Sequence, residues 1–353
     1  MKVGLVFGGR SVEHRVSIDS ARTVARGLRD AGHAVVPLLI AQDGSWRAPE
    51  VGVAVLAGEP SPGGEGDGAP GRSLEILLDA AVDAAFPIVH GTWGEDGTLQ
   101  GLFEVLDLPY VGAGVTASAV AMDKHLTKAV LERAAIPVVE WATVDARDGF
   151  EPDAVLPGAA GPFFVKPTVG GSSVGVEKVD TRSELPAAVE RCFAFDDRVL
   201  IERGVAGREL ECSVLGYRKL EAARLGEIVP GNEFYDYADK YIEDTAGLLV
   251  PAELDRELED RLRRTAVDAF AAIGGHGMAR VDFLVEGDER IFVNEINTLP
   301  GFPSISTYPK LWEASGVPID RLVDRLLEVA LARHCDRHRL DAGIKDFLAS
   351  LDS

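Results

Sequence analysis

Residues 279–297, ARVDFLVEGDERIFVNEIN, decide the fold of the C-terminal part of the chain. Two segments of alternating apolar residues flank the turn-forming sequence EGDE at 286–289, which predicts a β-hairpin. If the turn is centred between positions 288 and 289, Asp282 lies directly opposite Glu295. Asn297 then shares the face of Glu295, because side chains alternate along a strand with a period of two. The hairpin therefore brings three oxygen-bearing side chains together.

The carboxylate pair in this hairpin predicts a cation site. Carboxylates that face each other across two strands repel. A solvated sheet face would tolerate the pair, but Val281 and Val293 belong to flanks that are typical of a buried sheet, where an unpaired carboxylate costs several kcal/mol. Two carboxylates and an amide oxygen form a ligand set of the Mg²⁺ type. We predict that Asp282, Glu295 and Asn297 bind Mg²⁺ (or Mn²⁺).

A second motif lies between two expected strands, at 163–166 and 174–179. The first strand ends in Lys166, and the loop GGSSVG follows at 170–175. Glycines let a backbone approach a ligand and serines add donors, so the loop suits phosphates. It lacks the GxxxxGK[ST] pattern of a Walker A loop. A Gly/Ser loop alone is more often an ordinary turn. The neighbouring lysine and the expected metal site instead favour a loop that covers and binds phosphates.

A competing motif is GAGVTA at 112–117, which fits the G-x-G-x-x-A signature of dinucleotide-binding folds. That signature needs an acidic residue about 20 positions later, at the end of a second strand. Asp123 comes too early and falls in an expected helix. We therefore expect no nicotinamide cofactor.

The first third of the chain alternates expected strands and helices, which predicts a parallel sheet. Apolar runs at 2–7, 34–40 and 84–89 are the main strands, and a helix is expected at 21–31. The glycine-rich segment 58–71 is expected to be a loop.

Farther along, strands cluster at 199–202 and 209–215, and long helices are expected at 252–273 and 319–332. A chain of 353 residues is too long for one core. We therefore expect an α/β protein with α+β modules. The expected domains are 1–120, 121–215 and 216–353.

The composition, with 46% hydrophobic and 26% charged residues, is that of a soluble globular protein. No apolar run approaches the ~20 residues that cross a bilayer. The apolar patch at 2–7 is too short for a signal peptide. The three cysteines are widely spaced and odd in number, so they imply no disulfide framework. We expect a cytoplasmic protein.

The net charge of −21 opposes binding to nucleic acid or to an anionic membrane. If the substrate is a nucleotide, lysines and backbone N–H groups at the binding site must offset the negative electrostatic field of the whole chain. Lysines at such positions are therefore the candidates to examine.

Near the C-terminus, His334, Cys335 and His338 form a small group of metal-ligating residue types. A zinc site would need a fourth ligand and rigid support. We therefore interpret this group as the polar end of a helix.

Seven segments together carry a family pattern. In chain order they are GGRSVEHRVS, HGTWGEDGTLQG, MDK, VKPTVGGSSVG, FYDYADKY, ARVDF and NEINTLPGF, and they span nearly the whole chain. This assembly resembles the ATP-grasp ligases, and specifically the D-alanine–D-alanine ligase family. The resemblance implies a three-domain ATP-grasp fold with an N-terminal parallel-sheet domain, and ATP held between the sheets of the central and C-terminal domains.

The resemblance also implies a reaction. The carboxylate of a first D-alanine takes the γ-phosphoryl group of ATP and becomes an acylphosphate. The amine of a second D-alanine then attacks that carbonyl, giving the dipeptide for peptidoglycan precursor synthesis. The implied partners are small molecules, and a homodimer is usual for the family.

By resemblance, Glu13 holds the ammonium group of the first substrate. Without the family, it would be read as a residue at a helix N-terminus. Ser172 and Tyr241 resemble the two residues that bond to this glutamate and close the loops, and His90 matches a histidine near the reacting amine. Tyr241 also indicates the peptide-forming branch, because ester-forming members generally use a histidine-containing loop.

Two further groups of residues follow from the resemblance. Arg280 and the N–H of Gly301 resemble the donors that stabilise the tetrahedral oxyanion, a contribution of ~3 kcal/mol per donor. Ser306 matches the hydroxyl that binds the carboxylate of the second substrate. The metal ligands of the family match the three hairpin residues identified above.

The resemblance assigns the remaining residues to ATP. Glu202 resembles the residue at the adenine amino group, and Glu209 the one at the ribose hydroxyls. Val205 and Phe234 flank the ring, and Lys240 reaches the transferring phosphoryl group. The full ATP-contacting set is Lys124, Lys166, Ser173, Glu202, Val205, Glu209, Phe234 and Lys240.

Four positions depart from the family pattern. Arg15 stands where an acid is common, Thr-Trp at 92–93 replaces a Pro-aromatic pair, Pro303 replaces a threonine, and Thr307 replaces a large apolar residue. The last two lie close to the expected second amino acid. An alternative function is therefore a ligase with another acceptor, such as D-serine or a specialised-metabolite amino acid. A third hypothesis, a silent nucleotide-binding regulator, is opposed by the intact metal triad and lysines.

Overall fold

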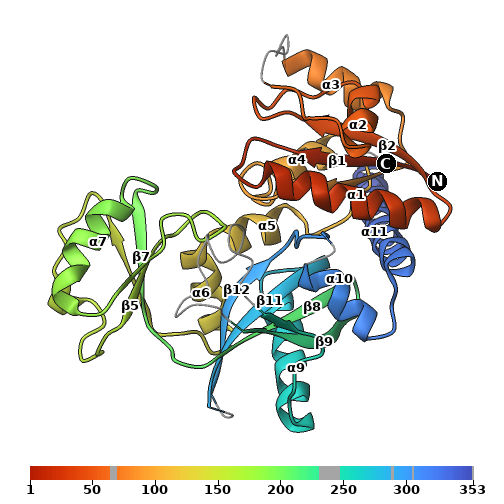
Figure 1. Ribbon diagram of the computed structural model, residues 1–353. Coiled ribbons are helices and arrows are strands. Elements are labelled where there is room, and N and C mark those ends of the chain that lie inside the picture. The colour runs from red at the N-terminus through yellow and green to blue at the C-terminus, as the bar shows by residue number, and fades with distance from the viewer. Residues whose placement is uncertain (64–69, 230–246, 288–289, 304–305, 352–353) are drawn as a thin grey trace.

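The computed structural model describes residues 1–63, 70–229, 247–287, 290–303 and 306–351. Within these ranges the strands form three sheets, each in a lobe with its own helices (Figure 1). The mixture of helices and sheets confirms the predicted α/β class.

The N-terminal sheet is parallel, as predicted, with the strand order β2-β1-β3. β1 (Lys2–Gly8) lies between β2 (Ala34–Ile40) and β3 (Ala84–Ile88), and all of it except Lys2 is buried. A parallel strand that is covered on both faces reads as a continuous apolar run, which is why the sequence predicted it. The helices of this lobe are α1 (His14–Asp30), α2 (Pro49–Leu56), α3 (Pro70–Asp79) and α4 (Thr98–Val105).

The central lobe holds an antiparallel sheet in the order β4-β7-β5-β6. Helix α7 (Leu185–Cys192) packs on it and shares a core with Phe163 and Val165. β5 and β6 pair around the GGSSVG loop, although β6 begins three residues later than the expected 174. The strands are β4 (Trp141–Asp145), β5 (Phe163–Pro167), β6 (Glu177–Val179) and β7 (Arg198–Arg203).

Two short helices, α5 (Val115–Met122) and α6 (Lys124–Arg133), connect the N-terminal and central lobes. The glycines that open this segment serve packing. A Cβ on Gly277 would lie 2.3 Å from the carbonyl oxygen of Gly112, so the two backbones meet where side chains have no room. Gly112 itself has a φ of 104°, and a Cβ on Gly114 would lie 2.9 Å from the ring of His276, so backbone conformation and packing account for the two glycines of the G-x-G-x-x-A pattern.

The C-terminal sheet is antiparallel, with the strand order β10-β9-β8-β11-β12. Helix α9 (Arg256–Ala272) covers one face, where Leu262 and Phe270 share a core with Val281. The opposite face lines the cleft that is described below. The strands are β8 (Arg208–Gly216), β9 (Leu220–Val229), β10 (Gly247–Leu249), β11 (Gly277–Glu286) and β12 (Arg290–Asn297).

The position of β8 bears on the domain boundaries. A division after residue 215 would separate β8 from β9 and β11, to which it is hydrogen-bonded. We propose three modules whose second boundary lies near residue 206, in the connection between β7 and β8.

The β11–β12 hairpin contains a β-bulge that a regular register does not predict. Asp282 pairs with Glu295, as expected, but Phe283 pairs with Val293, which leaves Asn294 as the extra residue. Strict alternation would have put Glu295 on the same face as Val293, which is buried in the core. The bulge instead directs both Asn294 and Glu295 to the cleft.

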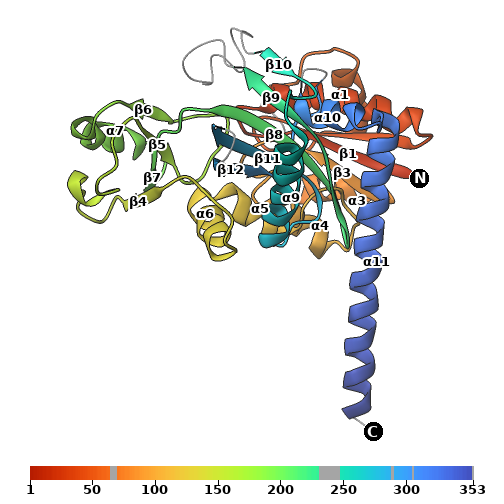
Figure 2. The ribbon, with the colours of Figure 1, turned by 90° about the horizontal axis from the view of Figure 1, so that it is seen from below.

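The chain ends in α10 (Thr307–Ala314) and the long helix α11 (Ile319–Leu351). The first half of α11 buries Leu322 and Leu326 beside α1, so the helix begins where predicted. It continues well beyond the predicted residue 332, and its last turns project from the body with Phe347 exposed (Figure 2). None of the helices in the described ranges combines the length and apolarity that spanning a membrane requires.

Candidate active site

Two adjoining cavities form one cleft among the three lobes. The N-terminal lobe, the loop after β5 and the open face of the C-terminal sheet all contribute to it. Both cavities are lined by Glu13, Ser172, Glu209, Glu295 and Asn297. Of the other predicted residues, Lys124, Lys166 and Ser173 line the first cavity, and His90, Arg280, Asp282, Gly301 and Ser306 line the second.

An acidic patch on the C-terminal sheet forms the floor of the cleft. Asp282 lies opposite Glu295 on one side and opposite Glu211 on the other. Burial raises the pKa of Asp282 to about 8; Arg280 opposes this shift, and the charges of Glu211 and Glu295 add to it. Within the part of the chain that the structure describes, Oε2 of Glu211 is buried without a hydrogen-bond partner. The patch gathers the carboxyl groups of Asp282, Glu211 and Glu295, and these oxygen donors fit a divalent cation.

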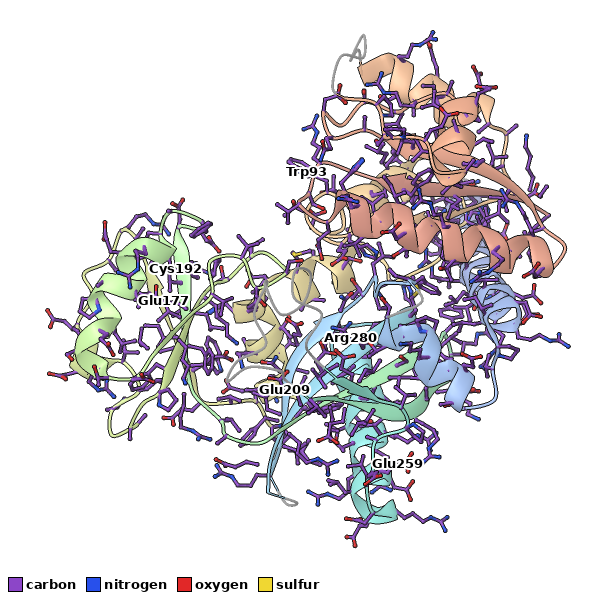
Figure 3. All side chains as sticks on the ribbon, in the orientation of Figure 1. Trp93, Glu177, Cys192, Glu209, Glu259 and Arg280 are labelled. Atoms are coloured by element: carbon purple, nitrogen blue, oxygen red, sulfur yellow. The ribbon has the colours of Figure 1, made fainter. Side chains whose placement is uncertain are left out.

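Arg280 is the cation already in this patch. Its Nε and Nη2 donate to the two oxygens of Asp282 at 2.7 and 2.6 Å, and Nε lies 3.3 Å from Oε1 of Glu211. Arg280 and Glu209 come from the neighbouring strands β11 and β8 (Figure 3). A fork-shaped guanidinium between two carboxylates is held in a defined orientation at the cleft.

Two lysines stand at the opposite wall of the cleft. Nζ of Lys124 donates to the carbonyl of Gly170 at 2.8 Å, which ties the start of α6 to the glycine-serine loop. Burial lowers the pKa of Lys124, and the charge of Glu295 works against this shift. Lys166 forms an ion pair with Glu202. Both ammonium groups therefore have anionic or carbonyl partners in the structure and face a cavity that suits phosphate oxygens.

Glu202 lies behind Lys166 at the centre of a buried charge cluster. Its second oxygen pairs with Lys128, whose side chain is 2% exposed. Burial alone would raise the pKa of Glu202, but the charges of Lys128 and Lys166 outweigh it and lower the pKa to about 2. The carboxylate is ionised at neutral pH, and one of its two lysines reaches the cleft.

The glycine-serine loop approaches Glu13 from the central lobe. Ser172 and Ser173 have φ values of 52° and 56°, in the left-handed region that lets successive N–H groups turn to one side. A Cβ built on Gly171 would lie 3.8 Å from Oε2 of Glu13. Glu13 is also the N-cap residue of α1, as its sequence position indicated, but its side chain makes no capping bond.

His90 is buried at the N-terminal wall of the cleft. Its Nε2 lies 2.9 Å from the hydroxyl of Ser20, and its Nδ1 lies 3.0 Å from the carbonyl of Leu299 and 3.3 Å from Glu95. Burial lowers the pKa of His90, but bonding and charge from Glu95 outweigh it and leave the pKa raised. These contacts fix the ring against the segment that follows β12.

At the end of the cleft beyond Arg280, Gly301 lies close to Ser306 at the start of α10. A Cβ on Gly301 would lie 2.8 Å from the hydroxyl of Ser306, so Ser306 can lie this close because residue 301 is glycine. Ser306 is the N-cap residue of α10, but its hydroxyl makes no capping bond. Pro303 and Thr307 line the same end.

Three predicted residues, Phe234, Lys240 and Tyr241, lie outside the described residues. Val205 is half-buried in the connection between β7 and β8. Glu202 and Val205 line neither cavity, so the cleft is formed by the other predicted residues.

Comparison with known proteins identifies the family. A family model described as "D-ala D-ala ligase N-terminus" matches residues 2–113, and one described as "D-ala D-ala ligase C-terminus" matches residues 130–328. The chain belongs to the D-alanine–D-alanine ligase family.

Individual family members match over nearly the whole chain. The D-alanine–D-alanine ligase of Solibacter usitatus is 45% identical over 338 residues, covering 95% of this chain and 96% of that protein. Ligase A of Escherichia coli is 42% identical over 351 residues, covering 95% and 96%. The ligase structure from Coxiella burnetii superposes with a TM-score of 0.80 at 36% identity, covering 98% and 99%. The VanG D-Ala:D-Ser ligase of Enterococcus faecalis gives 0.79 at 33%, covering 93% and 99%.

These matches confirm the family and the ATP-grasp fold that the motifs predicted. D-alanine–D-alanine ligases depend on ATP, so a nucleotide and a divalent metal ion are expected for the family in general.

Four residues of this D-alanine–D-alanine ligase family member were missed from its sequence. The first is Glu211. Together with the predicted Glu209 it alternates with buried Leu210 and Cys212 on β8, a pattern that could have revealed a second acidic strand beside Asp282. Asn294 escaped because the bulge was not foreseen. Glu95 and Lys128 carry no sequence signal, because their partners His90 and Glu202 become neighbours only on folding.

Proposed function

We propose that this chain is an ATP-dependent ligase that joins two D-alanines into D-alanyl-D-alanine for peptidoglycan precursor synthesis. The shared cleft carries the proposal: Glu13, Lys166 and the Asp282–Glu295 pair come from three lobes and line it together. A carboxylate for an ammonium group, a lysine for phosphates and an acidic pair for a divalent cation are what such a ligase needs. The relatives from S. usitatus and E. coli bear this activity in their names.

In the first step, Glu13 binds the ammonium group of the first D-alanine and directs its carboxylate toward the lysine wall. A carboxylate oxygen bonds to the γ-phosphorus of ATP, the bond to the β-phosphate oxygen breaks, and ADP leaves. Lys124 and Lys166 neutralise phosphate oxygens as the charge shifts. Ser173, Glu202, Val205 and Glu209 complete the proposed ATP contacts, together with Phe234 and Lys240.

In the second step, the neutral amine of the second D-alanine attacks the acyl carbon, the nitrogen releases one proton to solvent, and phosphate leaves with the electrons of the carbon–oxygen bond that breaks. Ser306 binds the carboxylate of this D-alanine. Arg280 and the N–H of Gly301 stabilise the tetrahedral oxyanion, because fixed donors need no reorganisation at that moment. His90 is 3% exposed and held from both ring nitrogens, so we assign it a positioning role beside Glu95. Ser172 and Tyr241 close the loops over Glu13.

The proposed metal ligands are Asp282, Glu295 and Asn297. Their fit rests on the buried, unpartnered oxygen of Glu211 and the carboxyl groups around Arg280. A Mg²⁺ (or Mn²⁺) ion bound there would supply positive charge to the transferring phosphates. Asn297 also accepts the N–H of Leu299 at 2.9 Å through its side-chain oxygen, which fixes the amide at the edge of the patch.

A second candidate acceptor is D-serine or another amino acid. Thr307 is a largely buried, hydroxyl-bearing residue at the acceptor end of the cleft, in the cavity that Pro303 also lines. The superposable VanG protein is a D-Ala:D-Ser ligase by name. A polar side chain in the acceptor pocket favours a substrate with a hydroxyl group, because it can form a hydrogen bond that alanine cannot.

Phosphate release with ATP, Mg²⁺ and a panel of D- and L-amino acids tests the proposal. We expect turnover with D-alanine alone and formation of its dimer. Turnover that requires D-alanine together with D-serine or another partner would support the second acceptor. Absence of turnover with every pair would reject both ligase functions and favour a nucleotide-binding regulator.

A Glu13→Gln variant tests the assignment of the first substrate. Because a hydrogen bond to a charged group contributes about 1.5–3 kcal/mol, we expect the KM of the first D-alanine site to rise about 10- to 100-fold. The KM for ATP should stay unchanged. Arg15→Gln is the matched control, since Arg15 is exposed two residues away on α1. Equal D-alanine KM values in the Glu13 variant and the control would refute the assignment.

From the family we also propose a cytoplasmic location and a homodimer. Both suit an enzyme whose substrates are small soluble molecules and whose net charge of −21 disfavours nucleic acid and anionic membranes. Light scattering of the purified full chain would determine the oligomeric state.

A further inference from the structure

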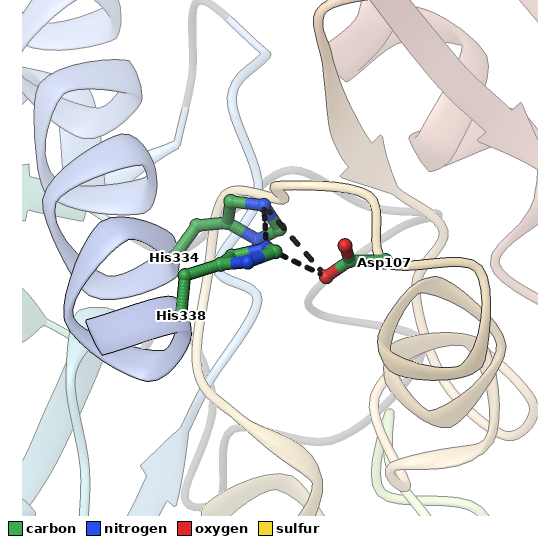
Figure 4. Close-up of side chains that lie close together, drawn as sticks. All are labelled: Asp107, His334 and His338. Carbon is green, nitrogen blue, oxygen red and sulfur yellow. Dashed lines mark hydrogen bonds and ion pairs between the residues drawn. The ribbon is translucent and has the colours of Figure 1, made fainter. Parts of the chain in front are cut away.

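A cluster of metal-ligating side chains lies outside the cleft. His334 and His338 are one turn apart on α11, and the structure places Asp107, which follows α4, against both of them (Figure 4). The sequence suggested the two histidines but no third ligand, because Asp107 is more than 200 positions away in the chain. Folding supplies that third ligand.

The three ligand atoms have the spacing of a metal site. Nε2 of His338 lies 3.0 Å from Nε2 of His334 and 3.0 Å from Oδ1 of Asp107, and the remaining side of the triangle is 3.8 Å. A point about 2 Å from all three atoms therefore exists, and this is the distance at which zinc binds imidazole nitrogen and carboxylate oxygen. No rearrangement of the backbone is needed for an ion to contact all three.

The support for Asp107 is rigid. It follows the C-cap of α4, where its own N–H donates to Glu104 at 3.2 Å and the N–H of Leu108 donates to Phe103 at 3.0 Å. Two successive bonds of this kind close the end of a helix and fix the residue between them. Asp107 has a φ of 53°, which aspartate tolerates better than most residues.

The support for the two histidines is equally firm. One residue before His334, Arg333 stacks on the ring of Tyr110 at 4.0 Å and donates to the carbonyl of Gly112 at 3.2 Å. Arg337 forms ion pairs with both Glu104 and Asp107. These contacts lock α11 to the N-terminal lobe on both sides of His334.

Among the described residues, Arg337 is the cation besides the two histidines that pairs with Asp107. It keeps its ion pair with Glu104 if Asp107 turns to a metal ion, so no arginine is left without a partner. A carboxylate oxygen can also accept from a guanidinium while it binds a metal, as supporting groups of metal sites do.

We propose that Asp107, His334 and His338 bind one zinc ion, with water as the fourth ligand. Two imidazoles select a zinc-like transition metal over Mg²⁺, which prefers oxygen ligands. The side chain of His334 is 18% exposed and that of His338 50%, so an ion can enter from solvent. The site would join α11, at the end of the C-terminal module, to the N-terminal lobe and stabilise the folded chain by mass action.

The test is calorimetric titration of Zn²⁺ into the untagged, metal-stripped full chain, with excess Mg²⁺ present to occupy the oxygen site of the cleft. We expect one tight zinc site per chain and a rise in melting temperature with zinc. Loss of a group that only supports a metal ligand weakens metal binding about 10- to 100-fold. Because His338 is a proposed ligand itself, we expect His338→Gln to weaken zinc binding by more than this. It should also abolish the zinc-dependent rise in melting temperature.

Cys335→Ser is the matched control, because Cys335 lies on the same helix and is exposed. It should bind zinc as the parent does. His338→Gln without zinc should melt at the temperature of the metal-stripped parent, since half of this side chain is exposed. Zinc binding of equal strength in the His338 variant and the parent, or loss of binding in the Cys335 variant, would overturn the assignment. Ligase activity does not enter either measurement, so this result is independent of the proposed function.

Discussion

Replacing Asp282 by asparagine is expected to reduce kcat by at least about 100- to 1000-fold, the range seen when one fixed electrostatic contact to a developing charge is removed. Asp282 is a proposed metal ligand and also the bidentate partner of Arg280. The change removes a carboxyl group from the patch and one of the two oxygen acceptors that face the guanidinium of Arg280. We therefore expect weaker binding of Mg²⁺ and a less fixed orientation of Arg280, the proposed oxyanion donor. The measurement is phosphate release at saturating ATP over a series of Mg²⁺ concentrations.

The control for this variant is Asp268→Asn, the same substitution on the exposed side of α9, behind the same sheet. It should keep the parent's kcat and its Mg²⁺ dependence. Thermal unfolding of both variants shows whether the chain is folded. A folded Asp282 variant with the parent's kcat and Mg²⁺ dependence would refute the metal assignment.

Replacing Glu202 by glutamine is expected to lower the free energy of unfolding of the central lobe by about 3–5 kcal/mol, because it leaves Lys128 charged and buried without a counter-charge. Lys128 is 2% exposed and pairs with Glu202, as does Lys166. Hydrogen exchange of the segment Arg198–Arg203 (β7), which contains residue 202, reports on this lobe directly. Its amides should exchange much faster in the variant.

The double variant Glu202→Gln/Lys128→Met separates the lost ion pair from a general disturbance. Removing both charges should recover much of the stability, because the fully buried ammonium group that lacks a counter-charge in Glu202→Gln is then absent. If the double variant were less stable than Glu202→Gln alone, the buried-charge explanation would be wrong.

The same cluster predicts a dependence on pH. The pKa of Glu202 falls from 4.5 to about 2 on folding, so its contribution is present above pH 4.5 and is lost as the pH falls toward 2. The stability difference between the parent and the glutamine variant should therefore shrink in that window. Measurement at pH 6 and at pH 3 checks the sign.

The hairpin at 279–297 shows how far local sequence reasoning reaches. It predicted the two strands and the pairing of Asp282 with Glu295, because alternation and turn chemistry are local properties. It missed the bulge at Asn294, although the spacing of Val293 and Ile296 held the signal: three positions separate two residues of one buried face. A regular strand would separate them by an even number, so an extra residue had to lie between.

The lengths of helices were predicted less well. α11 runs to Leu351, far past the predicted end, because its last turns are held by local helix bonds and not by an apolar face against the body. β9 and β10 were not foreseen at all. β9 pairs with β8, and β10 pairs with β9. Each pairing depends on a neighbouring strand of the sheet, so the local sequence of one segment does not reveal it.

The sequence by itself determined the α/β class, the family and the chemical types of the cleft residues, because motifs and periodicity are written in neighbouring positions. Only the tertiary structure decided which charges share a site. Glu202 meets Lys128 and Lys166 from separate elements, and Asp107 meets two histidines of α11 from across the chain. Burial then sets how strongly these charges act, because water no longer screens them. Both the stability of the central lobe and the proposed zinc site depend on such contacts between residues that are far apart in the sequence.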